Sequence, residues 1–504
     1  MEIELKLLLS HKLNAKLMAL PLLASHAAAA PRQQHLSARY FDTPDLHLLR
    51  HGAGLRVRKE DGVWIQTMKA GGSVQSGLHS RNEWEGPVSQ PWPQLGKLRK
   101  LIGKQAHWRA MLDAAGLKDR LEALFLVEVE RHTWDLDVDG NLIELVLDHG
   151  HIERQGRKLP VNEIELELKQ GDPAALFSFA LALHAQLPLR VSNINKAQRG
   201  YLLCRETGTE PFRAQALSLP PEASVAQALQ AILDNCLQHM QRNEQAVIEG
   251  DDPETLHQMR VGLRRLRSAL KLFDDVAPCP SAVSADIEWL GQQLGGARDA
   301  EVLLTTTLPR IHANPGGKNG LLVLQQLVLE TAQTQRQAAA AALLSPRYTF
   351  LLLSLGLWMQ RLPHTVADEP LTGFAQRTLQ RLHKRLLKRA AIMDASAPSS
   401  LHRTRIAAKR VRYALEFFHA LYGSKQVRRC ARRYLKAVAA IQSELGQHND
   451  LVVADDLLRT MAEQHPDALD TVSFARGYLQ ALQGQGTVDV DAIGQRLAAL
   501  ALPR

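Results

Sequence analysis

The sequence predicts an α+β protein in two parts: an antiparallel sheet or barrel with flanking helices, then an all-α domain of two duplicated helical bundles. Three observations support this class. The chain has 504 residues, which is too long for one ordinary domain of roughly 100–200 residues. Polar and apolar residues alternate early in the chain, whereas long stretches rich in Ala, Leu, Gln and Arg follow from Val225. One block of the helical part also occurs twice.

The expected strands are short runs with a period of two, which places every second side chain on one face. They lie at residues 1–7, 55–58, 64–69, 82–86 and 163–169. Turn signals such as Asp61-Gly62 and Asp139-Gly140 separate the runs, and helices are expected at about 10–20, 94–116 and 173–186. Short strands joined by such turns predict an antiparallel sheet or barrel.

A polar stretch with several Pro and Gly residues at 206–224 predicts a linker. We therefore expect one domain at 1–205, a linker at 206–222 and a second domain at 223–504. Within the second domain, breaks between helices are expected at 277–280, 314–320 and 397–400.

An internal repeat organises the helical domain. The block LHQMRVGLRRLR at 256–267 matches LHRTRIAAKRVR at 401–412, and LGGARD at 294–299 matches LGQHND at 445–450. Because a His, the basic positions and the later Gly and Asp recur in the same order, we expect two bundles related by a pseudo-two-fold axis.

The balance of charge predicts an anionic partner. There are 61 Lys+Arg against 52 Asp+Glu, a net charge of +9, which favours nucleic acid, anionic lipid or a phosphate-rich molecule. The 4 cysteines are too far apart for a CxxC metal or redox motif, so inert thiols are expected. Glu2 and Glu4 stand where a signal peptide would be cationic, and the apolar run at 348–359 is too short to span a bilayer. We expect a cytoplasmic protein.

Charged residues share one face of several predicted strands. The sets are Glu2, Glu4 and Lys6; Arg56 and Arg58; Glu83 and Glu85; Glu128 and Glu130; Glu144 and Asp148; and Glu163, Glu165, Glu167 and Lys169. Like charges two residues apart on a strand repel by roughly 2–2.5 kcal/mol at an effective dielectric near 20. The pattern predicts a barrel with a polar interior, where carboxylates bind a hard divalent cation and basic side chains bind phosphate. The sequence therefore predicts that the barrel interior binds a polyphosphate together with a metal ion.

These motifs resemble those of the CYTH family, the triphosphate tunnel metalloenzymes. EIELK at 2–6 is similar to the family's ExExK signature. The further blocks follow in the family's order: RYFDTPD at 39–45, LRVR at 55–58, TMK ending at Lys69, NEWEG at 82–86 and SNINKAQRGY at 192–201. The likeness covers about residues 1–205.

The CYTH resemblance implies an eight-stranded antiparallel tunnel that hydrolyses triphosphate compounds with a divalent metal. The implied metal ligands are Glu2, Glu4, Glu165 and Glu167. The implied catalytic cations are Lys6, Arg56, Arg58 and Lys69, and the implied substrate-binding residues are Arg39, Lys196, Glu83 and Glu85. Arg131 is left unassigned, because an inward Glu128 and Glu130 would point it outward.

The repeated blocks of the helical domain place basic residues in one stripe per helix. These residues, at steps of three and four, are His257, Arg260, Arg264 and Arg267, and His402, Arg405, Lys409 and Arg412. The blocks resemble the CHAD family, a histidine-containing α-helical domain often found beside CYTH domains. That resemblance covers about 223–504 and implies two helical bundles around a basic groove that binds inorganic polyphosphate.

The two resemblances predict a metal-dependent inorganic triphosphatase, a hydrolase that uses Mg²⁺ or Mn²⁺ and carries a polyphosphate-binding domain. Two alternatives stay open: a tunnel enzyme acting on thiamine triphosphate or ATP, and a non-catalytic polyphosphate receptor that targets granules. A nucleic-acid partner is least favoured, because no aromatic platform or groove-reading motif accompanies the basic helices. Metal preference, oligomeric state and the role of polyphosphate as substrate, regulator or anchor stay open.

Overall fold

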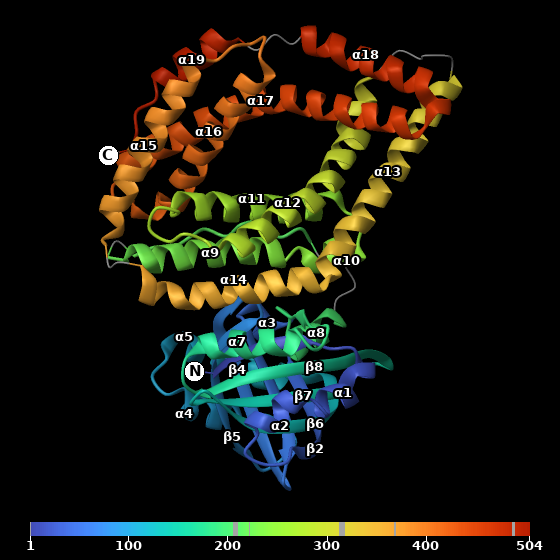
Figure 1. The fold of residues 1–504 in the computed structure, drawn as a ribbon. Helices are drawn as coiled ribbons and strands as arrows, with labels where there is room; N and C mark the ends of the chain where they lie inside the picture. Colours follow the sequence, from blue (N-terminus) through green and yellow to red (C-terminus); the bar gives the residue numbers. More distant parts are fainter. Residues whose placement is uncertain are drawn as a thin grey trace. The chain divides into compact units, whose positions relative to one another are not determined.

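The computed structural model of this chain describes residues 2–204, 210–220, 222–311, 318–366, 369–485 and 489–503 (Figure 1). The chain divides into two compact units. The first consists of Met1–Thr209 and Pro346–Gln360, and the second of Glu210–Ser345 and Arg361–Arg504. The expected linker at 206–222 lies partly outside the described residues, at 206–209 and 221.

The first unit contains the expected antiparallel barrel. Its sheet has the order β5-β4-β3-β2-β6-β7-β8-β1-β9, and a further pairing of β5 with β1 closes eight strands into a barrel, while β9 is a two-residue strand beside β1. The strands are β1 (Glu2–Leu8), β2 (Arg32–Asp42), β3 (Ala53–Glu60), β4 (Val63–Gln75), β5 (Leu78–Val88), β6 (Glu122–Val138), β7 (Asn141–Arg154), β8 (Arg157–Gln170) and β9 (Arg190–Val191).

Cross-strand pairing shows which side chains point into the barrel, since directly opposite residues share a face. Glu4 pairs with Glu167, Lys6 with Glu165, and Lys69 with Glu83, so these charged faces are continuous around the inside. The alternate positions, such as Leu5 and Leu7 of β1, are fully buried on the outside. The barrel therefore has an apolar outside and a charged inside, as the period-two pattern predicts.

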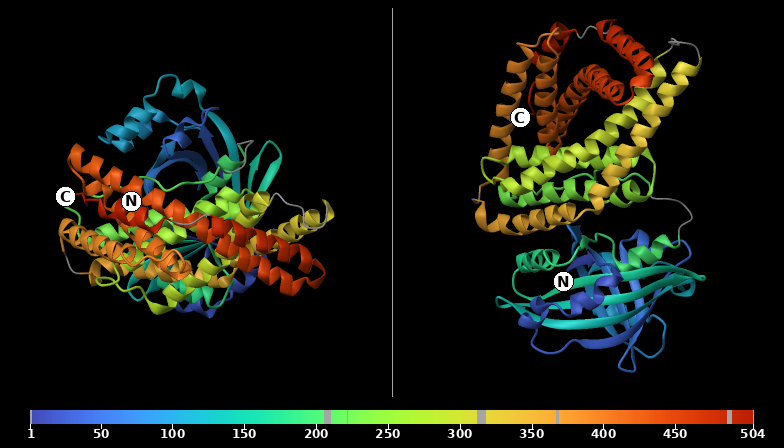
Figure 2. Two further views of the ribbon diagram at one scale, coloured as in Figure 1. Left: turned by 90° about the horizontal axis from the view of Figure 1, so that it is seen from above. Right: turned by 45° about the vertical axis from the view of Figure 1, so that its right-hand side comes forward.

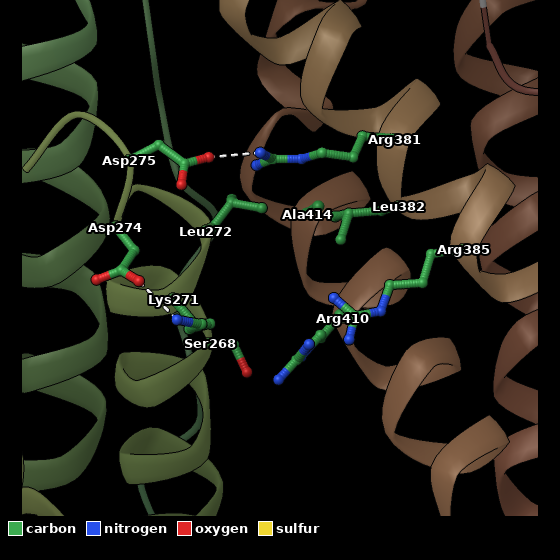
Figure 3. Close-up of a pocket in the computed structure, with 10 residues that line it drawn as sticks. All are labelled: Ser268, Lys271, Leu272, Asp274, Asp275, Arg381, Leu382, Arg385, Arg410 and Ala414. Atoms are coloured by element: carbon green, nitrogen blue, oxygen red, sulfur yellow. Dashed lines mark hydrogen bonds and ion pairs between the residues drawn. The ribbon is translucent and has the colours of Figure 1, made fainter.

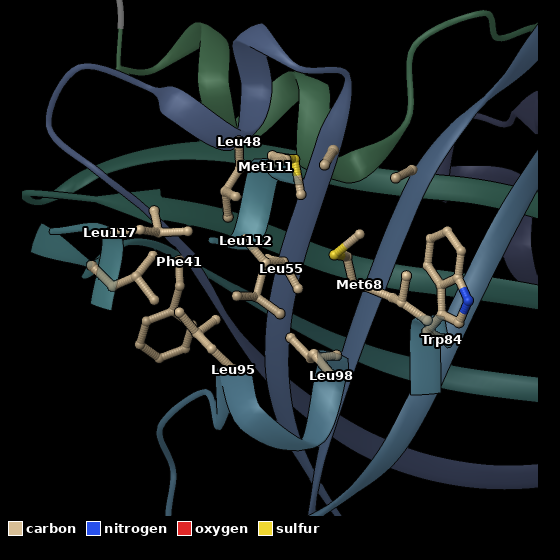
Figure 4. Close-up of a cluster of buried hydrophobic side chains, with 14 of the residues drawn as sticks. Phe41, Leu48, Leu55, Met68, Trp84, Leu95, Leu98, Met111, Leu112 and Leu117 are labelled. Atoms are coloured by element: carbon tan, nitrogen blue, oxygen red, sulfur yellow. The ribbon is translucent and has the colours of Figure 1, made fainter. Parts of the chain in front are cut away.

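Helices cover the apolar outside of the barrel. Over β3, β4 and β5, Leu55, Met68 and Trp84 pack against Leu95 and Leu98 of α4 and Leu112 of α5 (Figure 4). Over β1 and β8, the helix α7 buries Leu176, Phe177 and Leu183. The helices of this part are α1 (Asn14–Met18), α2 (Pro21–His26), α3 (His47–Arg50), α4 (Leu95–Ile102), α5 (Ala106–Leu112), α6 (Leu117–Arg120), α7 (Pro173–His184) and α8 (Lys196–Leu202), with a 3₁₀ turn at His11–Leu13.

The helix α8 fills one end of the barrel interior. It begins with a capping box between Asn195 and Gln198. Its residue Tyr201 joins a buried cluster with the inward side chains of Tyr40, Phe125 and Val127. A Cβ on Gly200 would lie 2.1 Å from the Phe125 ring, so only glycine allows this approach. The interior is therefore apolar around α8 and charged beyond it.

The helix α14 (Pro346–Thr365) belongs to the first unit through Gln360, although it comes late in the sequence. A Cβ on Gly356 would lie 2.2 Å from the Phe177 ring of α7, so a larger residue would clash there. The His184 ring also hydrogen-bonds the Pro346 carbonyl at 2.9 Å. The first unit therefore takes one of its covering helices from the second half of the chain.

The second unit is all-helical and duplicated (Figures 1 and 2). The packed neighbours α9–α11, α11–α12 and α12–α13 are matched by α15–α16, α16–α17 and α17–α18, and α11 packs against α16. Its helices are α9 (Val225–Gln241), α10 (Glu244–Glu249), α11 (Pro253–Leu272), α12 (Ser281–Val302), α13 (Lys318–Leu344), α15 (Leu371–Ala390), α16 (Pro398–Phe417), α17 (Lys425–Gln464), α18 (Leu469–Gln485) and α19 (Val490–Ala498), with a π-helical turn at Leu303–Thr307 and 3₁₀ turns at Leu308–Arg310, His419–Leu421 and Pro466–Ala468.

Among the described residues, no single helix is both long and apolar enough to cross a membrane, and one bent pair, Leu322–Leu344 with Pro346–Thr365, meets the criterion by length and composition only.

Candidate functional site

The centre of the barrel holds a buried lysine between carboxylates. Lys6 lies 2.8 Å from Glu4 and also forms an ion pair with Glu165. Burial disfavours the charged form of each side chain, but the ion pairs outweigh that effect. Glu165 and Glu4 raise the pKa of Lys6, and Lys6 lowers the pKa of Glu4. The strand β1 therefore presents a fixed cation and a fixed anion to the interior.

A second lysine, from α8, neutralises a carboxylate trio on β7 and β8. Lys196 lies 2.7 Å from Asp148 and 3.0 Å from Glu165, and it also pairs with Glu163. Oxygens of Asp148, Glu163 and Glu165 lie within 4.8 Å of one another, close enough to share a metal. Because Lys196 already bridges all three, this trio is better suited to hold the lysine in place.

Arg131 of β6 completes this acidic wall. Its guanidinium donates to both carboxylate oxygens of Asp148, at 2.8 and 2.6 Å, and lies 3.6 Å from Glu165. Asp148 is fully buried, and Lys196 and Arg131 lower its pKa despite that burial. Arg131 therefore points into the barrel and neutralises Asp148 through two hydrogen bonds, a role that the sequence left unassigned.

Carboxylates that are less well neutralised lie beside β1. Lys69 donates to both oxygens of Glu2, at 2.7 and 2.6 Å, and lies 3.6 Å from Glu83. Burial raises the pKa of Glu2, helped by Glu4 and Glu83, and burial also raises that of Glu167, helped by Glu2. The raised pKa values mean that the charged forms of Glu2 and Glu167 are disfavoured, so a cation bound beside them would stabilise both carboxylates.

The fit of a divalent cation follows from this donor set. Glu2, Glu4 and Glu167 offer only carboxylate oxygens, which hard cations such as Mg²⁺ and Mn²⁺ prefer. Glu4 and Glu167 are directly paired across β1 and β8, and Glu2 is close enough to Glu167 to raise its pKa. Of the four expected metal ligands, Glu4 and Glu167 are direct neighbours and Glu2 is near Glu167, whereas Glu165 belongs to the trio that Lys196 bridges.

Arginines on the facing strands supply the basic side of the interior. Arg56 of β3 is half-buried beside Tyr40, and Arg58 lies 3.6 Å from Glu85. Arg81 of β5 is opposite Glu2. Burial lowers the pKa of Arg58 and Arg81, because their neighbouring carboxylates do not fully offset the lost solvation. An anion in the interior would favour the charged form of both.

Two sets of side chains that the sequence analysis placed inside the barrel face outward in the structure. Arg39 pairs with Val57, whose side chain packs under the covering helices, so Arg39 lies outside, exposed, and the structure does not bring it to the interior cations. Glu128 and Glu130 also face outward, since Val127 and Val129 of β6 join the apolar interior around α8. That reversal is what turns Arg131 inward.

The sequence analysis did not assign two further interior residues, His79 and Arg81, although the period-two pattern of their strand indicated them. His79 and Arg81 continue the period-two face of Glu83 and Glu85 backwards along β5. The ring nitrogen Nε2 of His79 donates to the Ser192 carbonyl at 3.1 Å, and burial, with Lys6 nearby, lowers its pKa to about 3. His79 is therefore a neutral side chain opposite Glu4.

The helical unit brings the two expected basic stripes together. We call the central residues the cationic cluster: Arg260, Arg264, Arg405 and Lys409. Burial lowers the pKa of Lys409 to about 7, with further contributions from Arg405, Arg264 and Arg260, so the four lie near one another across α11 and α16. Arg260 lies 2.7 Å from Asp299, and its repeat Arg405 is next to Asp450.

The outer members of the stripes lie at the edges of this cluster. His402 is exposed and hydrogen-bonds Asn449 at 3.1 Å, while Arg412 lies 3.3 Å from Glu416. Burial lowers the pKa of His257, with Arg298 beside it, and Arg267 is exposed next to Gly291. Gly295 and Gly446 occupy equivalent places, each leaving room for the arginine of its own repeat.

Comparison with known proteins agrees with this division. Residues 1–201 match the model of the CYTH domain, and residues 231–459 match that of the CHAD domain. An inorganic triphosphatase of Haemophilus influenzae is 34% identical over 203 residues, which make up 40% of this chain and 54% of that protein. The chain thus matches about half the length of that relative.

Two further similarities extend into the helical half. An uncharacterized protein of Mycobacterium tuberculosis is 27% identical over 480 residues, covering 90% of this chain and 87% of that protein. The crystal structure of the CHAD domain from the plant Ricinus communis is 58% identical, covers 59% of this chain and 99% of that chain, and has a TM-score of 0.56.

Proposed function

We propose that this chain, which carries a CYTH domain followed by a CHAD domain, is a divalent-metal-dependent inorganic triphosphatase with a polyphosphate-binding helical domain. The observation that carries the proposal is the barrel interior, where a carboxylate wall at Glu2, Glu4 and Glu167 shares one space with inward arginines and lysines. The similarity of the barrel to an inorganic triphosphatase supports it. We place the protein in the cytoplasm.

In the proposed reaction, Glu2, Glu4 and Glu167 would hold Mg²⁺ or Mn²⁺, which would supply neutralisation of phosphate charge and polarisation of a phosphoryl oxygen. Arg56, Arg58 and Arg81 bind the equatorial oxygens, where charge accumulates in a loose transition state. Lys6 and Lys69 contact phosphates from the β1 side of the interior. Glu163, Glu165 and Asp148 keep Lys196 and Arg131 in position through their ion pairs.

The helical domain is proposed to bind polyphosphate through the cationic cluster. Arg264 and Lys409 have no ion-pair partner among the described residues, and burial, together with repulsion from the neighbouring arginines, lowers the pKa of Lys409. A flexible polyanion supplies negative charge every few ångströms and releases counterions as it binds, so its affinity should fall steeply with salt.

The hydrolase proposal is tested by steady-state assays of the purified chain with inorganic triphosphate, ATP and thiamine triphosphate, with Mg²⁺ and with a chelator. We expect the highest kcat/KM with inorganic triphosphate, and no turnover with the chelator. A preference for ATP or thiamine triphosphate would assign another substrate to the same barrel. Absence of turnover with every compound would leave a polyphosphate receptor.

The polyphosphate proposal is tested by reversing charge in the cationic cluster. We expect Arg260→Glu with Arg405→Glu to weaken binding of long-chain polyphosphate far more than Arg429→Glu with Arg433→Glu, which changes exposed arginines of α17. Calorimetry with polyphosphate, and with single-stranded DNA of matched charge, measures both. Equal affinity for the two polymers, or equal losses in the two variants, would reduce the cluster to a nonspecific basic surface.

A further inference from the structure

A pocket of about 170 Å³ lies in the second unit, between α11, α15 and α16 (Figure 3). A water molecule occupies about 30 Å³ of liquid, so the pocket is large enough for a polyatomic ion. Figure 3 shows Arg385 and Arg410 directed into the space with the Ser268 hydroxyl beside them, while the ammonium group of Lys271 is turned toward Asp274. Arg410 follows Lys409 by one residue, about 100° around the helix, so it is off the stripe of the cationic cluster.

The duplicated fold supplies an internal control for this pocket. The repeated blocks make Arg265 the equivalent of Arg410. Arg265 is buried and partly satisfied: its Nη2 donates to the Asn235 side chain at 2.8 Å, and its guanidinium lies 5.4 Å from the centre of the Phe417 ring. Burial raises the pKa of Glu416, and Arg265 is close enough to offset part of that rise. Arg265 thus has two acceptors around it, Asn235 from its own copy and Glu416 from the other, together with the Phe417 ring.

Around Arg410, cations stand at the two positions that hold the acceptors Asn235 and Glu416 around Arg265. When the alignment of the repeated blocks is continued by four residues, Lys271 is at the position equivalent to Glu416. Reciprocal hydrogen bonds, from Val225 to Glu369 and from Leu371 to Ala223, align the starts of α9 and α15. That alignment puts Arg381 at the position of Asn235 and Arg385 at that of His239. The pocket around Arg410 therefore has cations at the positions that Asn235, His239 and Glu416 occupy around Arg265.

Two of the four cations have local counterions. Lys271 pairs with Asp274, and Arg381 pairs with Asp275, both at the edge of the pocket (Figure 3). Within the part of the chain that the structure describes, Arg385 and Arg410 have no ion-pair partner. Burial lowers the pKa of Arg410, and Arg385 lowers it further. These two guanidinium groups repel each other unless an anion lies between them.

We propose that this pocket is a second anion site, separate from the cationic cluster, which binds one phosphoryl group between Arg385 and Arg410. Planar guanidinium groups bind phosphoryl oxygens in a bidentate manner, and the Ser268 hydroxyl and Lys271 add further donors. Two sources share this chemistry: free orthophosphate, and the terminal group of a polyphosphate chain. The site does not depend on the proposed hydrolysis in the barrel.

The first experiment maps arginine reactivity in the full chain. The protein is treated with phenylglyoxal, and modified peptides are quantified by mass spectrometry at constant ionic strength with chloride, orthophosphate or long-chain polyphosphate. We expect the phosphate compounds, but not chloride, to protect Arg385 and Arg410. Protection by orthophosphate assigns free phosphate, and protection by polyphosphate alone assigns a chain terminus. Equal modification in all three conditions would overturn the proposed site. Because the experiment uses the unmodified chain, its result does not depend on whether a variant folds.

The second experiment gives the pocket the chemistry of the first copy. Lys271→Glu with Arg381→Asn restores the two acceptors, and Arg429→Glu with Arg433→Asn makes the same change in charge on exposed positions of α17. We expect the pocket variant to require about ten-fold or more orthophosphate or polyphosphate for protection of Arg410, as expected for a lost charge-assisted hydrogen bond. The control should match the unmodified chain. Equal behaviour of the two variants would reduce the effect to long-range charge and overturn the proposal.

Discussion

The barrel interior and the cationic cluster both concentrate charge, but they balance it differently. Inside the barrel, carboxylates and cations of different elements form ion pairs, so that Asp148 meets Arg131 and Lys196, and Glu2 meets Lys69. In the cationic cluster, Arg264 and Lys409 face other cations, and the pKa of Lys409 falls to about 7. The helical unit therefore leaves positive charge for a ligand to neutralise, whereas the barrel neutralises most of its own.

This difference follows from secondary structure. A closed sheet places residues of two neighbouring strands directly opposite each residue, so an opposite charge is available within about 5.5 Å on either side. Two helices that cross offer fewer such neighbours, and the repeat places the same basic stripe on both. A duplicated helix pair thus concentrates one sign of charge, while a barrel can pair both signs. The following predictions test that contrast.

Glu4→Gln should have the largest effect, a loss of triphosphate hydrolysis of about a hundred-fold or more, beyond the cost typical of residues that only support a metal ligand. Glu4 is nearly buried, and Lys6 keeps it ionised, so the amide removes a fixed negative donor from the expected metal wall. Steady-state kinetics at saturating Mg²⁺ measure the change, and a thermal melt checks the fold. Glu130→Gln, on the exposed outer face of β6, is the matched control. Near-full turnover of the Glu4 variant would remove Glu4 from the site.

Arg131→Met should lower the free energy of unfolding by about 3–5 kcal/mol, because Asp148 then loses one of its two cations at a fully buried position. Arg32→Met breaks the pair with Asp135, in which both side chains are more than half exposed, and should cost at most about 1 kcal/mol. Urea denaturation of both variants gives the comparison. Similar losses would mean that the interior pair is solvated like a surface pair.

Arg56→Ala and Arg58→Ala should each raise KM and lower kcat for triphosphate. The expected cost in kcat/KM is about 1.5–3 kcal/mol, the value of a hydrogen bond to a charged group. Both residues face the interior beside Tyr40 and Glu85 respectively. Arg39→Ala, on the outer face of the adjacent strand β2, should leave both constants unchanged. If Arg39 matters and the other two do not, the substrate binds outside the barrel.

The smallest effect concerns Lys409, whose pKa of about 7 lies below that of a free lysine. Between about pH 7 and 10 the folded chain binds fewer protons here than the unfolded chain, so this residue makes stability rise with pH across that window. Polyphosphate favours the charged form, so its binding should take up a proton, and affinity should fall as pH rises above 7. Calorimetry in buffers of different ionisation enthalpy measures the uptake. Lys409→Arg should abolish it, and unchanged uptake would place the titrating group elsewhere.

The sequence alone determined the faces of the strands whose charges alternate without interruption. In β1 the residues Glu2, Glu4 and Lys6 share one face, and in β8 Glu165 and Glu167 do, because side chains alternate with a period of two; their charge correctly indicated the interior. It also determined the duplication of the helices, since the repeated blocks carry the same stripe. These features are local: each depends on spacing within one segment.

Only the tertiary structure decided the placement of Arg131 and Arg39. A strand's pattern says which residues share a face, but not which face is inside. In β6 the apolar face of Val127 and Val129 turns inward because α8 fills that end of the barrel, and Arg131 follows them. In β2 the inward positions are Ala38 and Tyr40, paired with Arg58 and Arg56, so Arg39 is left outside. Burial by a helix distant in sequence, rather than polarity, sets the direction of both strands.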